Sequence, residues 1–202
     1  MPTIEHSALT SGELHEPKGA DAASEGMVYV ADGAGSGTWT FSPLGWGTYQ
    51  DNAGNQIITT TETLLSNNGG GASTIETQLP YPIRGSSSLW DTVGNKITPV
   101  AAFDVYNVRL DLPVTAESGS PTELRIELDI SGSGTYAGAT IIVDRFANTG
   151  RVVPYIISLS YPVYSGTTFL ANGGQFWLST DAGSVTITNP TISLFRVYGA
   201  LT

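Results

Sequence analysis

The chain has 202 residues, no cysteine and a formal net charge of −10, from 18 acidic and 8 basic side chains. The lack of cysteine excludes disulfides and thiolate metal sites, and the negative charge disfavours nucleic acid and anionic lipid as partners, because phosphates require cationic neutralisation. Charged residues make up only 13% of the chain, so small polar residues must cover most of the surface, a composition that favours β-structure.

The first residues do not have the pattern of a secretory leader. Met1–Gly12 lacks a basic stretch followed by an apolar run, and no stretch of the sequence approaches the length of a membrane span. We therefore expect a soluble protein that is made in the cytoplasm and has no membrane partner.

Residues 1–48 are predicted to form an extended, Gly-rich arm. Its one clear strand is Met27–Val30, which the turn signal Asp32-Gly33 follows, and Thr38–Phe41 is the expected return strand of a hairpin. An isolated hairpin is marginal in water, and the arm buries too little apolar surface to order itself, so we expect it to lie on a partner surface. The anchoring contacts are expected from Leu14, His15, Pro17, Tyr29 and Trp39.

Residues 49–84 are predicted to form a polar connector, in which Ser66–Gly71 is a flexible loop by composition. A weak internal echo brackets this region, because Asp51–Ile57 resembles Asp91–Ile97 in sequence. Both segments are expected to be tight turns, with a left-handed glycine, that lead into a strand. A calcium site at 51–55 is disfavoured, because the spaced acidic ligands of an EF-hand are missing.

Residues 85–202 are predicted to form one compact β domain. Leu124, Ile126 and Leu128 alternate with polar residues, which predicts a strand with one buried and one wet face. The alternation over residues 103–112 slips once at Tyr106-Asn107, which predicts a β-bulge. Many short strands separated by turn signals predict an all-β fold, with the arm followed by an antiparallel β-sandwich or jelly roll.

The last strand carries bulky apolar residues on both of its faces. A terminal strand of this kind lies either in the middle of a sheet or against another subunit. We therefore predict an interface with other subunits that includes Ile192, Leu194, Phe195, Val197 and Tyr198.

Several segments of this domain resemble TNF/C1q-like jelly rolls, in particular the versions at the ends of phage fibres and spikes. The opening of those domains is similar to Leu89–Asp91, Asn95–Pro99 and Val105–Leu110, and their close to Phe169–Gly174, Val185–Asn189 and Ile192–Leu194. The resemblance covers roughly the C-terminal half of the chain. It implies a homotrimer packed about a three-fold axis, and it carries no catalytic residues.

The arm has a resemblance of its own. Leu14–Gly19 followed by Val28–Trp39 is similar to the start of small phage structural proteins that attach to the outside of capsids or to tails. This implies a non-enzymatic head fibre or capsid decoration protein on the outer surface of the virion, with a major capsid or other virion protein as its partner. The alternative is a receptor-binding module of a tail fibre that recognises a host surface glycan.

Catalytic and metal chemistry have weak support in the sequence. The two histidines, His6 and His15, lie in the arm without a third ligand on a rigid scaffold, and no Gly-x-Ser-x-Gly motif is present. Glu127 and Asp129 share a strand face about 7 Å apart, a separation that glycosidases use, but Arg125 shares that face and nothing marks a cleft. A polysaccharide-degrading enzyme is therefore the weakest alternative, and we predict no cofactor and no metal.

The four tryptophans leave two interpretations open. Aromatic faces stack on the apolar faces of sugars, so they could include a glycan platform. Spread along the chain, they fit core and interface packing better. They are Trp39, Trp46, Trp90 and Trp177.

Overall fold

The computed structural model describes residues 22–24, 27–31, 34, 37–118, 121, 123–132, 140–144, 152–162 and 168–199. Side chains are described for these ranges except 118, 140–144 and 152–162. The chain divides into two compact units, residues 1–42 and residues 43–202. The named elements are strands apart from the short helix α1 (Thr168–Asn172). Within the described residues no helix is long and apolar enough to cross a bilayer.

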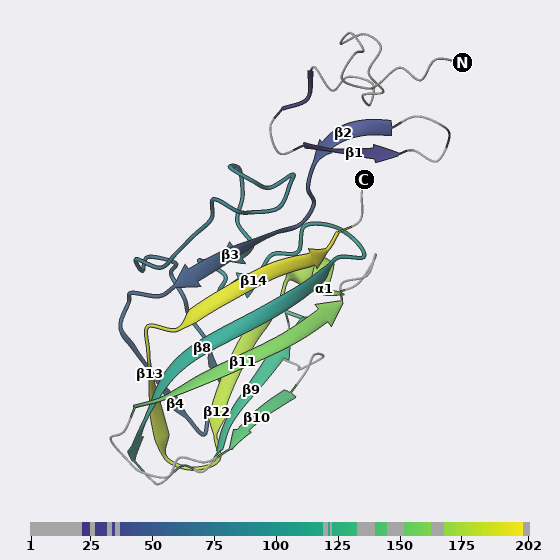
Figure 1. Ribbon diagram of the computed structural model, residues 1–202. Coiled ribbons are helices and arrows are strands. Elements are labelled where there is room, and N and C mark those ends of the chain that lie inside the picture. The colour runs from purple at the N-terminus through teal and green to yellow at the C-terminus, as the bar shows by residue number, and fades with distance from the viewer. Residues whose placement is uncertain are drawn as a thin grey trace, which may run out of the picture. The chain divides into compact units, whose positions relative to one another are not determined.

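The larger sheet of the second unit consists of long antiparallel rows (Figure 1). Its strands are β3 (Gly45–Gln50), β4 (Asn55–Thr59), β8 (Val105–Ser118), β11 (Val152–Pro162), β13 (Ser184–Thr188) and β14 (Thr191–Tyr198). β11 pairs with one edge of β8, while β14 and β13 pair end to end along its other edge. β3 pairs with β14 and β4 pairs with β13, so these two strands form the outermost row.

The row formed by β14 and β13 and the row formed by β3 and β4 are interrupted at the same level. The Asp51 amide donates a 2.9 Å hydrogen bond to the Pro190 carbonyl, and the Asn189 amide donates to the Gly54 carbonyl. Gly54 (φ 102°) and Asn189 (φ 47°) take left-handed conformations that let each row bulge and continue. The turn predicted at residues 51–57 is therefore a kink within one row and not a chain reversal.

The second of the two similar segments, Asp91–Ile97, does reverse the chain. It joins β6 (Trp90–Asp91) to β7 (Lys96–Ile97), which pair antiparallel. The residue with positive φ is Asn95 (49°) and not the predicted glycine, Gly94. Asparagine tolerates this conformation better than other residues with a Cβ atom do, and its side chain also accepts a hydrogen bond from the Asn67 amide.

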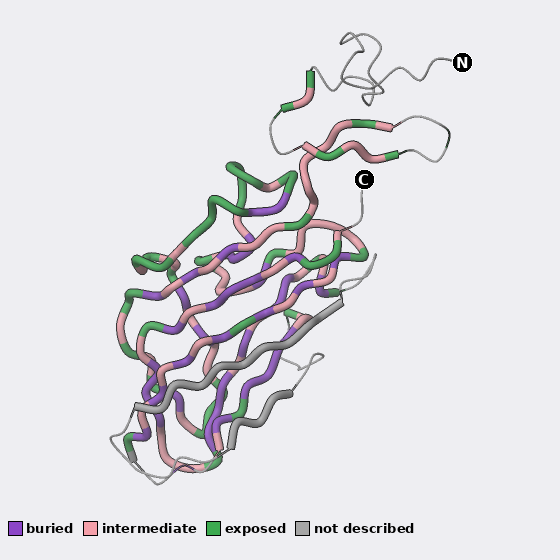
Figure 2. The backbone as a smooth tube through the Cα atoms, viewed as in Figure 1, coloured by how far each residue is buried: buried purple, intermediate pink, exposed green. Residues whose placement is uncertain are grey.

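The smaller sheet packs against the larger one. Its strands, in spatial order, are β10 (Thr140–Asp144), β9 (Glu123–Asp129), β12 (Gln175–Thr180) and β5 (Thr63–Leu64), all antiparallel. The core lies between the two layers, where alternate residues of β8 and the apolar residues Leu124, Ile126 and Leu128 of β9 are buried (Figure 2). The predicted all-β antiparallel sandwich is confirmed.

Ile192 and Leu194 belong to this core. Both are completely buried, and they lie beside Leu110 and Val108 of β8 in the sheet. The burial of each side chain contributes about 1.5–3 kcal/mol to folding. They leave no surface for a second copy of the chain, so we remove both from the predicted trimer interface.

The pairing of β8 is regular at Tyr106-Asn107, and the irregularity near this point lies on β14. Arg196 pairs with Tyr106 and Tyr198 pairs with Val105, so Val197 is the extra residue. The alternation in the sequence breaks where β8 begins. Phe103, which the predicted alternation included, lies before the strand, at a positive φ of 61°.

The predicted connector is part of the sandwich. β4 and β5 lie within residues 49–84 and form edge strands of the larger and the smaller sheet respectively. The loop after β5 is tied down by Asn67, which is fully buried and donates to the carbonyls of Tyr49 and Pro190. The second unit therefore begins at Pro43 and not at residue 85. Short, polar edge strands resemble loops in composition, which explains the difference.

One end of the sandwich is held by a buried ion pair. The Arg196 guanidinium donates to Asp104 Oδ1 at 2.6 Å, and both side chains are almost completely buried. Arg196 Nη1 also donates to the carbonyls of Pro43 (3.0 Å) and Tyr81 (3.1 Å). The Tyr106 hydroxyl donates to Asp104 Oδ2 at 2.9 Å. We call this set of bonded groups the Arg196 hub, and it joins β14 and β8 to two loops.

The first unit contains a two-stranded hairpin, as predicted. β1 (Met27–Ala31) pairs antiparallel with β2 (Gly37–Phe41). Tyr29 lies opposite Trp39, and their rings meet edge to face with centroids 5.4 Å apart. Each residue of these two strands is at least partly exposed, so the hairpin has no buried core of its own.

Candidate functional site

Large apolar side chains are exposed around the Arg196 hub. Tyr81 belongs to the hub, Val197 follows the hub residue Arg196, and Tyr198 follows Val197. Leu44 follows Pro43, and Phe103 precedes Asp104. We call this group the apolar rim, and its members, with their exposed fractions, are Leu44 (47%), Tyr81 (45%), Phe103 (53%), Val197 (51%) and Tyr198 (58%).

Phe103 of the rim has an unusual backbone conformation. Its φ is 61°, in the left-handed region that bulky residues rarely enter. The hydrogen bonds of the hub surround it, since Asp104 Oδ2 accepts from the Ala101 amide and the Tyr106 hydroxyl accepts from the Val100 amide. The hub therefore holds an exposed aromatic side chain at a strained backbone position.

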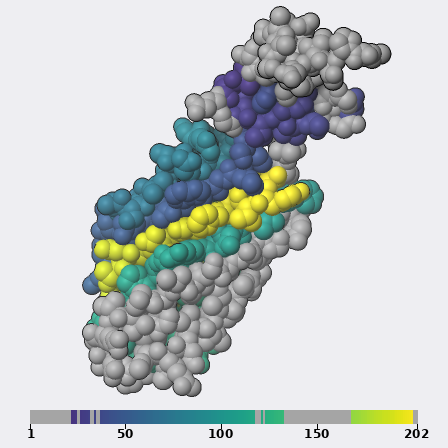
Figure 3. Space-filling model, in the orientation of Figure 1, coloured from purple at the N-terminus to yellow at the C-terminus, as the bar shows by residue number. Residues whose placement is uncertain are grey.

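The outer face of the larger sheet continues from the rim (Figure 3). β3, β14 and β8 lie side by side across this view of the molecule. Phe195 points outward and stacks on Trp46 of β3, with ring centroids 6.1 Å apart. Next to this pair, the hydroxyls of Thr48 and Ser193 meet at 3.1 Å. The face is therefore aromatic near the rim and polar beyond it.

The predicted interface residues of the last strand thus divide into two groups. Ile192 and Leu194 are core residues. Phe195 is half-buried on the outer face, and Val197 and Tyr198 are exposed in the rim. The second group remains a prediction for contact with other copies, and the rim adds Leu44, Tyr81 and Phe103 to it.

The predicted anchoring residues are described only in part. Leu14, His15 and Pro17 lie outside the described residues, as does His6. Tyr29 and Trp39 form the cross-strand pair of the hairpin. They therefore remain predicted contacts for a partner surface.

The carboxylates considered for catalysis are not on a wet face. Glu127 is 8% exposed and Asp129 is completely buried, so the predicted polar face of β9 is largely covered. Asp129 Oδ1 accepts hydrogen bonds from the amide and the hydroxyl of Ser131, at 2.7 and 2.6 Å. Asp51 is likewise occupied, since its carboxylate accepts from the amides of Ala53 and Asn68. In the described part of the chain, no three acidic or histidine side chains are grouped to hold a metal.

The tryptophans do not form one platform. Trp39 lies in the hairpin and Trp46 on the outer face of the larger sheet. Trp90 is buried and donates through Nε1 to the Asn67 carbonyl, and Trp177 is half-buried on β12. Two of the four thus support the packing interpretation of these residues.

Burial also perturbs two tyrosines of the core. It raises the pKa of Tyr49 to about 12, although the Ser88 hydroxyl and the Leu89 amide donate to its oxygen. Burial, and then the adjacent Asp104 carboxylate, raise the pKa of Tyr106 far above its ordinary value. Both hydroxyls are therefore neutral at physiological pH.

No protein-family model and no curated protein sequence matches the chain. Similar solved structures include the PRD1 vertex protein P5, with 14% identity, a TM-score of 0.46, and coverage of 87% of this chain and 84% of that one. The Eiger TNF of S. frugiperda is similar at 11% identity and a TM-score of 0.43, covering 79% of this chain and 96% of that one. The infectious bursal disease virus VP2 subviral particle follows at 11% identity and a TM-score of 0.26, covering 85% and 42%. These likenesses are distant and do not assign a function to the chain.

Proposed function

We propose that the chain is a non-enzymatic structural protein of a phage virion, a trimeric head fibre or capsid decoration protein anchored by its N-terminal arm. The apolar rim carries this proposal, because a cluster of large apolar side chains left exposed on a folded domain marks an interaction surface. The hairpin supports it, since an aromatic pair without a core needs a partner to be buried. The resemblance of the arm to phage structural proteins supports the outer surface of a virion as the location.

In the proposed trimer, the rim residues Val197 and Tyr198 pack between copies. Val197→Asp would place a charge in that contact, while the side chain is exposed in the single chain, so folding should be retained. Val93→Asp is the matched control, because Val93 is 91% exposed and lies outside the rim. Light scattering should give the mass of three chains for the unmodified protein and for Val93→Asp, and a lower mass for Val197→Asp. A single-chain mass for the unmodified protein would contradict the trimer.

Anchoring by the arm is tested with a chain that starts at Pro43. The sandwich keeps its core and its hub in this truncation, so it should fold and keep the mass of the full-length protein. We expect it to lose association with virions that lack the protein, in co-sedimentation with the full-length chain as the positive control. Equal binding of the two chains would assign the anchor to the sandwich instead.

A second candidate function is that of a receptor-binding module of a tail fibre. One observation favours it: Thr60, Arg125 and Asp181 help to line a polar pocket at the end of the sandwich remote from Pro43. A polysaccharide-degrading enzyme has no comparable support, because this pocket is not lined by Glu127 or Asp129.

A further inference from the structure

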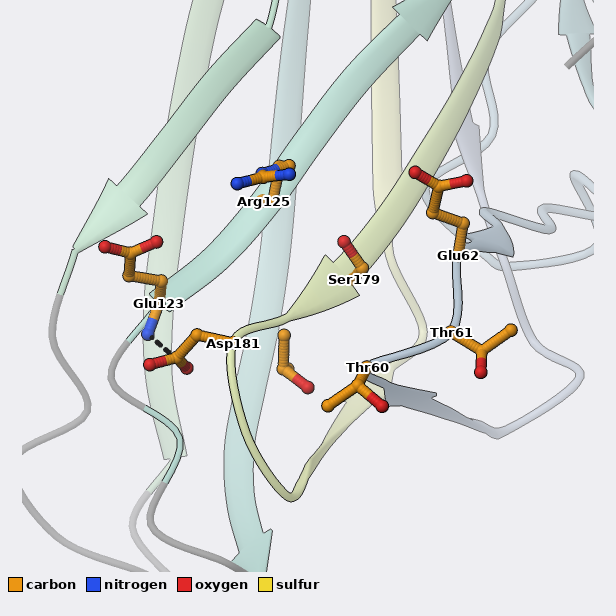
Figure 4. Close-up of a pocket in the computed structure, with 8 residues that line it drawn as sticks. Thr60, Thr61, Glu62, Glu123, Arg125, Ser179 and Asp181 are labelled. Carbon is orange, nitrogen blue, oxygen red and sulfur yellow. Dashed lines mark hydrogen bonds between the residues drawn. The ribbon is translucent and has the colours of Figure 1, made fainter. Parts of the chain in front are cut away.

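A surface pocket of about 520 Å³ opens where the smaller sheet ends (Figure 4). Its walls are the end of β12, the start of β9 and the loop between β4 and β5. Ligand sites in proteins have volumes of about 300–1,000 Å³, so the recess is large enough for a small molecule. The residues that line it include Thr60, Thr61, Glu62, Arg125, Ser179 and Asp181.

Ser179 occupies the floor of this pocket. It lies opposite Arg125 in the pairing of β12 with β9, and the register of β12 with β5 places Glu62 on its other side. Ser179 is only 9% exposed, and among the described residues its hydroxyl has no hydrogen-bond partner. Figure 4 shows this hydroxyl directed into the space between Arg125 and Glu62. A hydroxyl on a largely buried serine that is directed into a pocket and has no protein partner is available to bond a ligand group.

The charges of the pocket define the ligand class. Among the described residues, Glu62, Glu123 and Asp181 oppose the guanidinium of Arg125, which leaves a formal charge of −2 and disfavours an anionic ligand. A cationic ligand could bond the carboxylates but offers no acceptor to the Arg125 guanidinium. A neutral ligand that is rich in hydroxyls satisfies both kinds of group, because a hydroxyl donates to a carboxylate and accepts from a guanidinium.

The carboxylate of Asp181 is held in position for such a contact. Its Oδ1 accepts a 2.9 Å hydrogen bond from the Glu123 amide, which fixes the side chain. Glu62 and Arg125 are exposed, so their charged groups are accessible from solvent. The pocket thus presents acceptors and donors on different sides of Ser179.

The pocket also lies far from Pro43, where the sandwich follows the arm in the chain. The outermost row of the larger sheet runs from Gly45 to Thr59, and Thr60 of the pocket follows directly. Through β14 and β13, Gly45 is level with Tyr106 of β8 and Thr59 with Ser118, so at about 3.2 Å per residue this row separates Pro43 from the pocket by roughly 38 Å. The pocket therefore lies at the opposite end of the sandwich from Pro43, where the second unit begins.

We propose that this pocket binds a neutral saccharide, which rests on the glycan-recognition candidate above and assigns it a site. Arg125 and Ser179 donate to sugar hydroxyls, and Glu62 and Asp181 accept from them. No aromatic side chain is among the described residues that line the pocket, so a single site should bind weakly, and binding should depend on several sites acting together.

The test uses the full-length chain and neutral hexose and N-acetylhexosamine oligosaccharides displayed in many copies on a surface, beside sialylated and free-amine sugars. We expect binding to at least one neutral saccharide and a loss of tenfold or more for Arg125→Gln. Arg109→Gln is the matched control, because Arg109 is also an exposed strand arginine but lies on the larger sheet. It should bind like the unmodified chain, and Ser179→Ala should weaken binding severalfold without unfolding the protein.

Three results would overturn the proposal: no neutral saccharide bound, only charged saccharides bound, or equal binding by Arg125→Gln and the unmodified chain. The trimer and the anchor are measured separately, by the mass and the virion association of the same Arg125→Gln protein. Failure of saccharide binding with both of these intact removes the pocket proposal alone. Loss of the trimer mass or of virion association in the unmodified chain removes the structural proposal instead.

Discussion

The sandwich and the hairpin are both antiparallel β-structure, but only the sandwich buries side chains completely. Two facing sheets enclose its apolar residues, and the Arg196 hub closes one end. The hairpin has the same kind of cross-strand pairing and an aromatic pair, yet each of its residues remains partly exposed. Backbone pairing alone thus does not make a stable unit, since a second layer is needed to remove apolar surface from water.

The largest expected effect tests whether the hub stabilises the sandwich. Asp104→Ala leaves the Arg196 guanidinium buried without its carboxylate, so we expect the free energy of unfolding in urea to fall by about 3–5 kcal/mol. Asp111→Ala is the control, because it breaks the Arg109–Asp111 pair, whose side chains are 47% and 33% exposed. Breaking this exposed pair should change stability by about 0–1 kcal/mol. Similar losses in the two variants would contradict a stabilising role of the hub.

The next prediction concerns the two faces of the last strand. Leu194→Ala creates a cavity between the sheets and should lower the free energy of unfolding by about 2–5 kcal/mol. Val93→Ala, at an exposed loop position, should change it by less than about 0.5 kcal/mol. Chemical denaturation of both variants at one protein concentration checks this. A small effect at Leu194 would mean that the residue is not in the core and would return it to the predicted interface.

Alkaline pH should weaken the sandwich through Tyr49. Burial raises its pKa from 10.0 to about 12, so the folded state favours the neutral phenol. The resulting stability is fully present below pH 10 and is lost as the pH rises toward 12, by about 2–3 kcal/mol. Urea unfolding at several pH values measures the slope. Tyr49→Phe should flatten it without abolishing it, since Tyr106 is shifted in the same direction. An unchanged slope in this variant would contradict the role of Tyr49.

The elements of the fold that were predictable have local patterns. The alternation over β8 and β9 and the turn signal between β1 and β2 predicted these strands at nearly the observed positions. β4 and β5 were assigned to a connector, because edge strands are short and polar and owe their existence to neighbours remote in sequence. The row formed by β3 and β4 depends on a kink whose partner is Pro190, which no local pattern indicates.

The site was less predictable than the fold. Arg196 occupies an inward position after Ile192 and Leu194, so the sequence did contain the signal of a buried charge. Its partner Asp104 is 92 residues away, and nothing in the spacing identifies it. The rim follows from this contact, since it gathers residues from separate loops and strands. The exposed Val197 and Tyr198 were predicted for an interface, whereas Leu44, Tyr81 and Phe103 required the structure.

The smallest effect on stability is expected in the hairpin. Trp39→Ala removes the edge-to-face contact with Tyr29, which contributes about 0.5–1.5 kcal/mol to the hairpin itself. Because β1 and β2 share no strand with the two sheets, the unfolding of the sandwich, followed by circular dichroism, should change by less than about 0.5 kcal/mol. Virion association should nevertheless fall if the hairpin is part of the anchor. A loss above about 1 kcal/mol would show that the hairpin unfolds together with the sandwich, and the contrast between the two regions would then not hold.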